Sequence, residues 1–599
     1  MTATDLTAAD VAWDLETLLP DPGDKGVDTL LDEADALVAR VVPYRGRIAE
    51  CSTDEIVELV TLLASLSEII GRASSYAGLR FATDTSDPPR GALMMRVEER
   101  ATAMSTQLVF FELEWAALDD PAADVHLADP RLEFARHHLH SIRRYRPHLL
   151  TESEEIVLTE KNVTGASAWV RLFDELESAI SLDLDGESVS LEAGLARLGS
   201  PDPETRRAAA EAVTAGLAPG LRTRAYVFNT LIADKAVDDR MRSFPSWIAS
   251  RNLANEASDE SVAALIEAVE GRYSIAQRWY RLKARLLGVE RIRDYDRMAS
   301  IASSEAEFGF SEARELVLDS YASFSPDLAS IAQRFFEEQW IDAPVRPSKR
   351  PGAFCAYTVP SHHPYVLLNW TSRRRDVLTL AHELGHGLHA YLARPQGVFH
   401  QGTPLTLAET ASVFGETVTF GRLLSATTEP GERLALLAEN LEGQIATVFR
   451  QVAMNRFEDA VHRGRREQGE LSIDDFNAHW VATQSAMLGD SVELTEGYHT
   501  WWSYIPHFIA TPGYVYAYAY GQLLALAVYA QYEERGADFV PRYLELLAAG
   551  GSRPPEELGA IVGVDLADPA FWDRGLDIVD RQLTLTEEAA TAAGRGQSG

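Results

Sequence analysis

Cysteine and positive charge are both scarce in this chain. Only Cys51 and Cys355 occur among its 599 residues, which leaves no disulfide framework and no cysteine-based metal site. Its 55 lysines and arginines face 90 aspartates and glutamates, giving a formal net charge of −35. Because nucleic acids are bound through basic surfaces, this balance argues against a nucleic-acid partner.

Long apolar runs are also missing. No stretch approaches the roughly 18 uncharged apolar residues that a membrane span needs, so we expect no membrane association. Residues 1–20 contain neither the basic region nor the apolar core of a secretory signal. Together with the two cysteines, this predicts a cytoplasmic protein. The content of 46% hydrophobic and 24% charged residues is typical of a globular chain.

Segments of alternating polarity are few, and helical periodicity dominates. Apolar residues recur at spacings of three and four, which predicts a mainly α fold. The expected helices cover residues 28–40, 55–72, 91–118, 152–182, 205–217, 259–287, 311–339, 431–468 and 515–533. Strands are expected only at residues 181–185, 352–358 and 364–370.

Proline-containing turns indicate where the chain divides. The segment Ser200-Pro-Asp-Pro-Glu204 reads as a turn followed by a helix start. We therefore predict an N-terminal helical region at residues 1–199 and a second domain at residues 200–585. Small and polar residues near the C-terminus predict a disordered tail at residues 586–599.

One segment carries recognisable metal chemistry. Residues 379–389 read TLAHELGHGLH and contain His382-Glu383-x-x-His386. Histidines four residues apart lie one above the other on a helix face, so both imidazoles can bind one Zn²⁺. Glu383 lies about 100° round the helix, where it can take a proton from a zinc-bound water. The expected apolar face opposite the histidines would pack against the core.

The third ligand is expected from a following helix. A histidine ten residues after the first is excluded, because position 392 is leucine. Glu409 lies 23 residues after His386 in an apolar helical segment, and we predict that it is the third ligand. Glu416, two turns further along the same face, is predicted to accept a hydrogen bond from a ligand histidine. His389 lies one turn beyond the motif and is predicted to line the cleft, with a packing role as the alternative.

These motifs resemble the oligoendopeptidase F branch of the thimet-oligopeptidase family of zinc peptidases. The resemblance rests on TLAHELGHGLH (379–389), LAETASVFGE (407–416) and IPHFIATPGYVYAYAYG (505–521). Residues 13–20 and 146–176 extend it over nearly the whole chain. It implies two helical lobes around a deep substrate channel, with the zinc at the channel floor and a small sheet beside the zinc helix. It also implies internal cleavage of short unfolded peptides in the cytoplasm, and makes residues 200–585 the catalytic domain.

The resemblance further implies that a histidine and tyrosines stabilise the oxyanion. At the matching positions stand His507, Tyr514 and Tyr518. Hydrolysis builds negative charge on the former carbonyl oxygen, so a second donor beside the metal lowers the barrier. Tyr514 and Tyr518 are four residues apart on one expected helix face, whereas Tyr516 would point elsewhere. Which tyrosine donates is left open by the spacing.

If the protein is a zinc peptidase, two of the predicted strands would take part in substrate binding. Zinc peptidases of the thermolysin type hold their substrate as an added strand on a sheet edge near the zinc helix. Gly352, Ala353 and Phe354 are predicted to form this edge, since a small residue lets a peptide backbone approach. Residues 364–370 would be the inner neighbour. A purely structural hairpin is the alternative.

Two other functions compete with a zinc oligoendopeptidase. A helical zinc metallocarboxypeptidase would need a channel closed at one end and a cation for the substrate's terminal carboxylate. The arginines within residues 371–376 could supply that cation, although a solvated loop is the simpler interpretation. A non-catalytic peptide-binding protein on the same scaffold is disfavoured, because such scaffolds lose a ligand or the motif glutamate, and here all four residues are present.

The motif predicts about one Zn²⁺ per purified chain. We expect His382→Ala and Glu409→Ala to lose the metal, because each variant removes one of three protein ligands. Elemental analysis of the purified proteins measures this directly. Stoichiometric zinc in both variants would contradict the ligand assignment.

Overall fold

The computed structural model describes residues 7–301 and 307–595. Within these ranges the chain is mostly helical and contains small sheets of two, two and three strands, which confirms the predicted mainly α fold. In the same ranges no helix combines the length and the apolar character needed to cross a membrane.

The structure divides into two compact units, each assembled from three segments. The first unit comprises Met1–Leu149, Glu305–Leu423 and Val528–Asp565, and the second comprises Leu150–Ser304, Leu424–Ala527 and Leu566–Gly599. These units do not follow the sequence division predicted at residue 200. The chain passes repeatedly from one unit to the other, so segments that are far apart in the sequence pack within the same unit.

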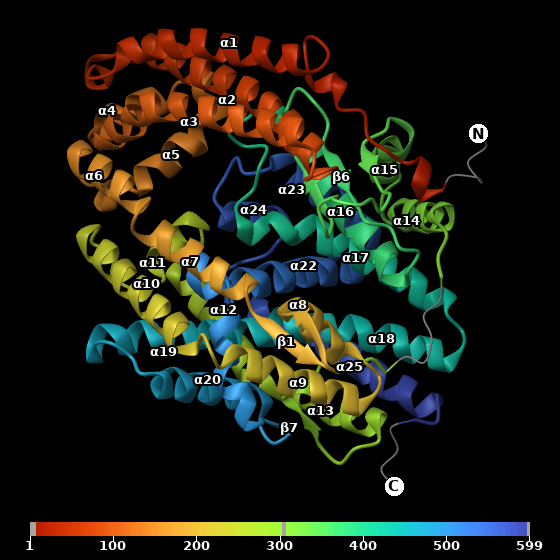
Figure 1. Cartoon of the computed structure of the whole chain (residues 1–599). Coiled ribbons are helices and arrows are strands. Elements are labelled where there is room, and N and C mark those ends of the chain that lie inside the picture. Colours follow the sequence, from red (N-terminus) through yellow and green to blue (C-terminus); the bar gives the residue numbers. More distant parts are fainter. Residues whose placement is uncertain (1–6, 302–306, 596–599) are drawn as a thin grey trace. The chain divides into compact units, whose positions relative to one another are not determined.

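Eleven helices belong wholly or mainly to the described part of the first unit. They are α1 (Asp24–Val41), α2 (Thr53–Ala82), α3 (Pro88–Ala117), α4 (Asp120–Leu127), α5 (Arg136–Arg144), α14 (Phe310–Phe324), α15 (Pro326–Glu337), α16 (Arg374–Ala393), α17 (Leu405–Ala426), α23 (Val540–Ala549) and α24 (Pro555–Ile561). Helices α1, α2 and α3 lie side by side (Figure 1). Ser52 begins α2 with a capping box, in which its hydroxyl accepts the Glu55 N–H and Glu55 accepts the Ser52 N–H.

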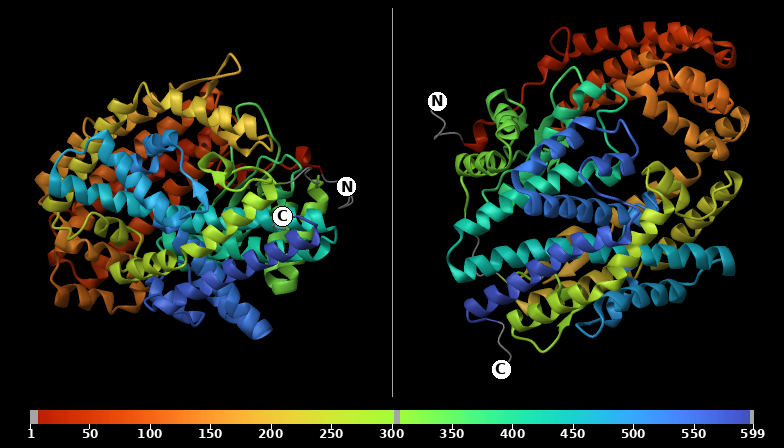
Figure 2. Two further views of the ribbon diagram at one scale, coloured as in Figure 1. Left: turned by 90° about the horizontal axis from the view of Figure 1, so that it is seen from below. Right: turned by 180° about the vertical axis from the view of Figure 1, so that it is seen from behind.

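The remaining helices belong wholly or mainly to the second unit. They are α6 (Glu152–Asn162), α7 (Ala166–Ser178), α8 (Leu191–Ala196), α9 (Pro203–Leu217), α10 (Leu221–Met241), α11 (Ala249–Ala254), α12 (Asp259–Gly271), α13 (Tyr273–Leu287), α18 (Pro430–Ile445), α19 (Gln451–Gln468), α20 (Ile473–Leu488), α21 (His507–Ala510), α22 (Tyr516–Arg535) and α25 (Pro569–Ala592). Helices α18 and α25 pack side by side (Figure 2).

Several predicted helices are interrupted. The predicted helix at 311–339 is α14 and α15, because Ser325 is extended and Pro326 starts a new helix. The predicted helix at 259–287 breaks at Arg272, between α12 and α13. The tail predicted from residue 586 is wrong over its first part, since α25 continues to Ala592. Residues 596–599 of that tail lie outside the described residues.

Three strands form the sheet beside α16. Their order is β4 (Ile341–Asp342), β6 (Tyr365–Leu367), β5 (Phe354–Ala356). β5 pairs antiparallel with β6, with Cys355 opposite Val366, and β6 pairs in parallel with β4. The structure thus confirms strands within residues 352–358 and 364–370, and places β5 at the edge with β6 inside.

Two further pairs of strands lie in the second unit. β1 (Ser181–Leu184) was expected, and it forms an antiparallel hairpin with β2 (Glu187–Ser190), which was not. Asp185 and Gly186 connect them with φ of 58° and 81°, as a tight hairpin turn requires. β3 (Ile292–Arg293) pairs in parallel with β7 (Val492–Glu493).

Each unit has its own apolar core. In the first unit, one cluster gathers around α1, α2 and α3 and includes Leu30, Ile69 and Tyr365 of β6. A second cluster joins α2 and α3 to α4 and α5 around Trp115. In the second unit, Phe228 stacks on Phe476 at a centroid distance of 5.2 Å, in a cluster that also contains residues of α19 and α21.

Helices α16 and α17 approach each other unusually closely. A Cβ atom at Gly385 would lie 2.6 Å from Ser412 Cα and closer still to the Ala411 carbonyl oxygen, so only glycine fits there. A Cβ at Gly415 would collide with the Tyr321 hydroxyl, which donates a 2.8 Å hydrogen bond to the Ala381 carbonyl. Two glycines therefore allow this helix pair to pack backbone against backbone.

We predict that Gly385→Ala destabilises the protein by about 1–3 kcal/mol, because the new methyl group overpacks a contact made by backbone. Calorimetry should show a lower unfolding midpoint for the first unit, together with weaker zinc binding. Gly78→Ala in α2 is the matched control. It places a methyl group in open space and should be neutral or stabilising. An unchanged midpoint in Gly385→Ala would contradict the close-packing argument.

Candidate metal centre

Helix α16 presents two chemically different faces. Val377, Leu380 and Leu384 are fully buried on one face. On the other face, the side chain of His382 is 27% exposed and that of His386 is 15% exposed. This is the division that the apolar spacing predicts. Residues 371–376 lead into the start of the helix, where the Asp376 carboxylate accepts the backbone N–H of Arg373.

The structure brings His382, His386 and Glu409 together. Glu409 Oε2, on α17, lies 3.4 Å from His382 Nε2 and 3.5 Å from His386 Nε2. The Glu409 carboxylate also accepts a 2.6 Å hydrogen bond from the Ser412 hydroxyl. Within the described residues, these three side chains make up the group able to hold a metal ion. We call them the triad.

The outer nitrogens of both histidines are engaged. His382 Nδ1 donates to Glu416 Oε2 at 3.2 Å, and His386 hydrogen-bonds to the backbone of Ala408. These contacts orient the rings so that both Nε2 atoms point toward Glu409.

The triad fits a zinc ion. Ligands about 2.0–2.1 Å from a tetrahedral zinc stand about 3.3–3.4 Å from one another, close to the distances observed here. Two imidazoles and one carboxylate are also the ligand set of catalytic zinc sites that keep a fourth position open.

The charges in the triad shift the pKa of each member in the metal-free protein. Burial opposes the charged form of His382, yet the Glu416 hydrogen bond and the charges of Glu409 and Glu416 raise its pKa to about 9. Burial lowers the pKa of His386 to about 4, against the charge of Glu409. Burial would raise the pKa of Glu409, but the two imidazoles hold it below its ordinary value.

Glu383 lies beside the triad in a nearly dry position. It is 7% exposed, and burial raises its pKa to about 7. The charge of His382 opposes this rise and that of Glu409 adds to it, while the backbone N–H of Cys355 stabilises the carboxylate. A carboxylate tuned to neutral pH can both accept and return a proton.

His389 differs from its neighbours on α16. It is only 2% exposed, and neither ring nitrogen has a hydrogen-bond partner among the described residues. Burial lowers its pKa to about 3. These features favour the packing alternative over the predicted cleft-lining role, which stays a prediction.

The edge strand lies next to Glu383. In the described sheet β5 pairs only with β6, so no strand is paired with its outer side. Phe354 is in β5, whereas Gly352 and Ala353 precede it, with Gly352 at φ 80°. All three residues are at least partly exposed. Their predicted role in substrate binding remains a prediction.

In the second unit, His507, Tyr514 and Tyr518 form a cluster. His507 Nε2 and the Tyr518 hydroxyl are hydrogen-bonded at 3.2 Å, and the Tyr514 ring lies 5.1 Å from the Tyr518 ring. Burial and the charge of Arg450 lower the pKa of His507. Tyr514 precedes α22 instead of lying within it, since that helix begins at Tyr516.

A turn between His507 and Tyr514 assembles this cluster. Gly513 adopts φ 73°, and its N–H donates a 2.8 Å hydrogen bond to Glu458. Tyr516 points away, as predicted: it is fully buried and its hydroxyl accepts a 3.0 Å hydrogen bond from Asn255.

The sequence reasoning missed Tyr357, which follows β5. Its ring centroid lies 6.4 Å from that of His386. Burial raises its pKa, and the Cys355 thiol and the carboxylates Glu409 and Glu383 raise it further. No spacing rule connects Tyr357 to the zinc motif, so the sequence offered no signal.

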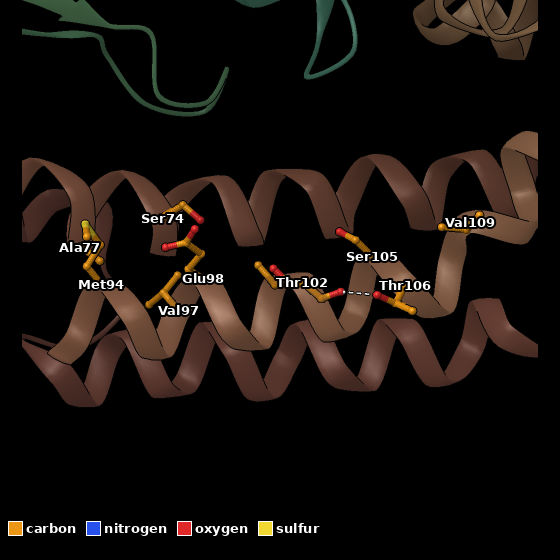
Figure 3. A pocket seen from close by; sticks show the side chains of 10 residues that line it. Ser74, Ala77, Met94, Val97, Glu98, Thr102, Ser105, Thr106 and Val109 are labelled. Atoms are coloured by element: carbon orange, nitrogen blue, oxygen red, sulfur yellow. Dashed lines mark hydrogen bonds between the residues drawn. The ribbon is translucent and has the colours of Figure 1, made fainter. Parts of the chain in front are cut away.

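A separate groove of about 490 Å³ lies along α2 and α3 (Figure 3). Ser74 and Ala77 line it from α2, and apolar, small and polar side chains with a single carboxylate, Glu98, line it from α3. It shares no residue with the triad, and its lining has none of the chemistry found there.

Comparisons with known proteins find relatives over most of the chain. The family model described as Peptidase family M3 matches residues 197–578, and the one described as Oligopeptidase F matches residues 114–181. Oligopeptidase PepF of Bacillus subtilis is 26% identical over 591 residues, covering 97% of this chain and 87% of that protein. Group B oligopeptidase PepB of Streptococcus agalactiae is 26% identical and covers 96% of each chain. The crystal structure of oligoendopeptidase-F from Enterococcus faecium is similar in fold, with a TM-score of 0.72, 22% identity, and coverage of 95% of this chain and 99% of that one.

We predict that Glu416→Gln weakens zinc affinity about 10–100-fold, because a neutral amide orients and polarises His382 less well than a carboxylate. Competition with a chromogenic chelator measures the affinity. Asp319→Asn is the matched control, since it removes the same charge from an exposed partner of Arg422 at the end of α17. Equal zinc affinity in Glu416→Gln and the control would rule out this role for Glu416.

Proposed function

Because the chain belongs to peptidase family M3 and is a metallopeptidase of the oligoendopeptidase F group, we propose that it is a zinc-dependent oligoendopeptidase cutting internal bonds of short unfolded peptides. The observation that carries this proposal is the triad with the buried Glu383 beside it. Its relatives are oligopeptidases and an oligoendopeptidase by name, which supports peptides as substrates.

In the proposed mechanism, His382, His386 and Glu409 hold the metal and Glu383 moves the proton. A bound Zn²⁺ supplies Lewis-acid polarisation of water and of the substrate carbonyl. Glu383 accepts a proton from the attacking water and returns it to the nitrogen of the departing peptide. Its pKa of about 7 in the metal-free protein supports both transfers. Glu416 orients His382 through Nδ1.

His507, Tyr514 and Tyr518 are proposed to donate hydrogen bonds to the substrate. Tyr514 and Tyr518 are half-buried, so their rings reach solvent while being held by neighbours. Tyr516 is excluded from this role by its buried bond to Asn255.

The substrate backbone is proposed to add to the outer edge of β5. An edge strand offers unpaired N–H and C=O groups, and an extended peptide satisfies them by β-augmentation. The β5 edge lies beside Glu383, as the Cys355 N–H contact indicates. A peptide bound there would present its backbone to the proposed base.

Glu383→Gln tests the proposed base. The amide keeps the size of the side chain but cannot accept a proton, so turnover of a quenched peptide should fall by at least about 10²–10⁴-fold while zinc is retained. Glu337→Gln, at an exposed site on α15, is the control and should behave like the wild type. Near-normal turnover of Glu383→Gln at full zinc content would disprove the mechanism.

A peptide length series tests the reaction class. Mass spectrometry of the products should show cleavage at internal bonds of peptides up to about two dozen residues, with folded proteins left intact. Release of single C-terminal residues at every length would instead identify a carboxypeptidase. Efficient cleavage of casein in mid-chain would argue against selection of short peptides.

A further inference from the structure

Tyr357 is the aromatic residue that links the edge strand to the triad. It follows Ala356, the last residue of β5, and its ring is tilted 52° to the ring of His386. Tyr357 and the triad belong to the same compact unit. The side chain is partly exposed, so it is accessible to a ligand in the site.

The hydroxyl of Tyr357 has no hydrogen-bond partner among the residues that the structure describes. Two buried tyrosines of this unit are bonded within the protein. Tyr321 donates to the Ala381 carbonyl, and Tyr365 donates to the Asp14 carbonyl at 2.7 Å. The Tyr357 side chain is instead partly exposed, so its hydroxyl is accessible as a donor to a ligand bound beside His386.

The backbone directly after Tyr357 has an uncommon conformation and is fixed by hydrogen bonds. The next residue, Thr358, has φ 59°, a left-handed conformation that a β-branched residue rarely adopts. Its hydroxyl donates a 2.9 Å hydrogen bond to the His363 carbonyl, and the Gln401 amide contacts the Tyr357 carbonyl at 3.4 Å. Strain of this kind persists only where surrounding contacts enforce it, and it is concentrated at functional sites. Here it turns the backbone directly after Tyr357.

Tyr357 can act as a donor, because a tyrosine hydroxyl carries its proton at neutral pH. A substrate added to the β5 edge would pass Cys355, whose N–H contacts Glu383, and then reach Tyr357. The bond to be cut must lie beside Glu383, and its carbonyl oxygen is the atom that gains negative charge.

From this geometry we infer that Tyr357 is a catalytic residue whose hydroxyl donates a hydrogen bond to the carbonyl oxygen of the peptide bond being cut. The inference rests on the proposed function and adds to it a donor from the unit that carries the triad. The donor is independent of the His507 cluster in the second unit. The bond strengthens as charge develops on the oxygen, so it favours the transition state over the bound substrate.

Tyr357→Phe tests this assignment, because it removes one hydroxyl and leaves the ring in place. We expect kcat for a quenched peptide to fall about 10²–10³-fold, with KM changed less than about twofold. The affinity for a phosphinic peptide, which mimics the charged intermediate, should fall by a similar factor in calorimetry. Zinc content and the unfolding midpoint should be unchanged.

Tyr391→Phe is the matched control. Tyr391 lies on α16 of the same unit, but its hydroxyl is bonded to Arg334, so kcat and phosphinic peptide affinity should stay at the wild-type level. Wild-type kcat in Tyr357→Phe would overturn the inference, and so would a rise in KM alone or a loss of zinc. A zinc-loaded wild-type protein that cuts no peptide would refute the proposed function itself.

Discussion

The close contact between α16 and α17 is the constraint on which the candidate site depends. Glu409 can approach His382 and His386 only because the two helices pack backbone against backbone at Gly385 and Gly415. A side chain at either glycine would push α17 outward and separate the carboxylate from the imidazoles. Packing and metal chemistry are therefore coupled in this unit, and the Tyr321 bond to the α16 backbone reinforces the arrangement.

The same contact accounts for the electrostatics of the site. Two carboxylates from α17 lie against two imidazoles from α16 in a largely buried setting, where their interactions are weakly screened. They raise the pKa of His382, and the imidazoles lower that of Glu409. A divalent cation between these groups would satisfy the Nε2 atoms and the carboxylate together. Burial gives Glu383, beside these groups, a raised pKa in the metal-free protein.

The proposed donor groups come from two sources. Tyr357 belongs to the unit of the triad, whereas His507, Tyr514 and Tyr518 form their cluster in the second unit. The turn at Gly513, whose N–H is bonded to Glu458, directly precedes Tyr514, and the left-handed Thr358 directly follows Tyr357. Irregular backbone therefore lies beside both tyrosines, whereas the triad lies on the regular helices α16 and α17.

The sequence by itself determined what depends on local spacing. It predicted the helical fold, the shared face of His382 and His386, the edge and inner strands, and the turning away of Tyr516. It also selected Glu409, although the three-dimensional contact with His386 required the glycines of α16 and α17. It missed β2 despite the Asp185-Gly186 turn signal. The predicted domain boundary at residue 200 stays a prediction, and each compact unit is assembled from three segments that only packing brings together. The place of Tyr357 beside His386 was decided by tertiary structure alone, because it depends on the packing of β5 against α16, which no local periodicity encodes.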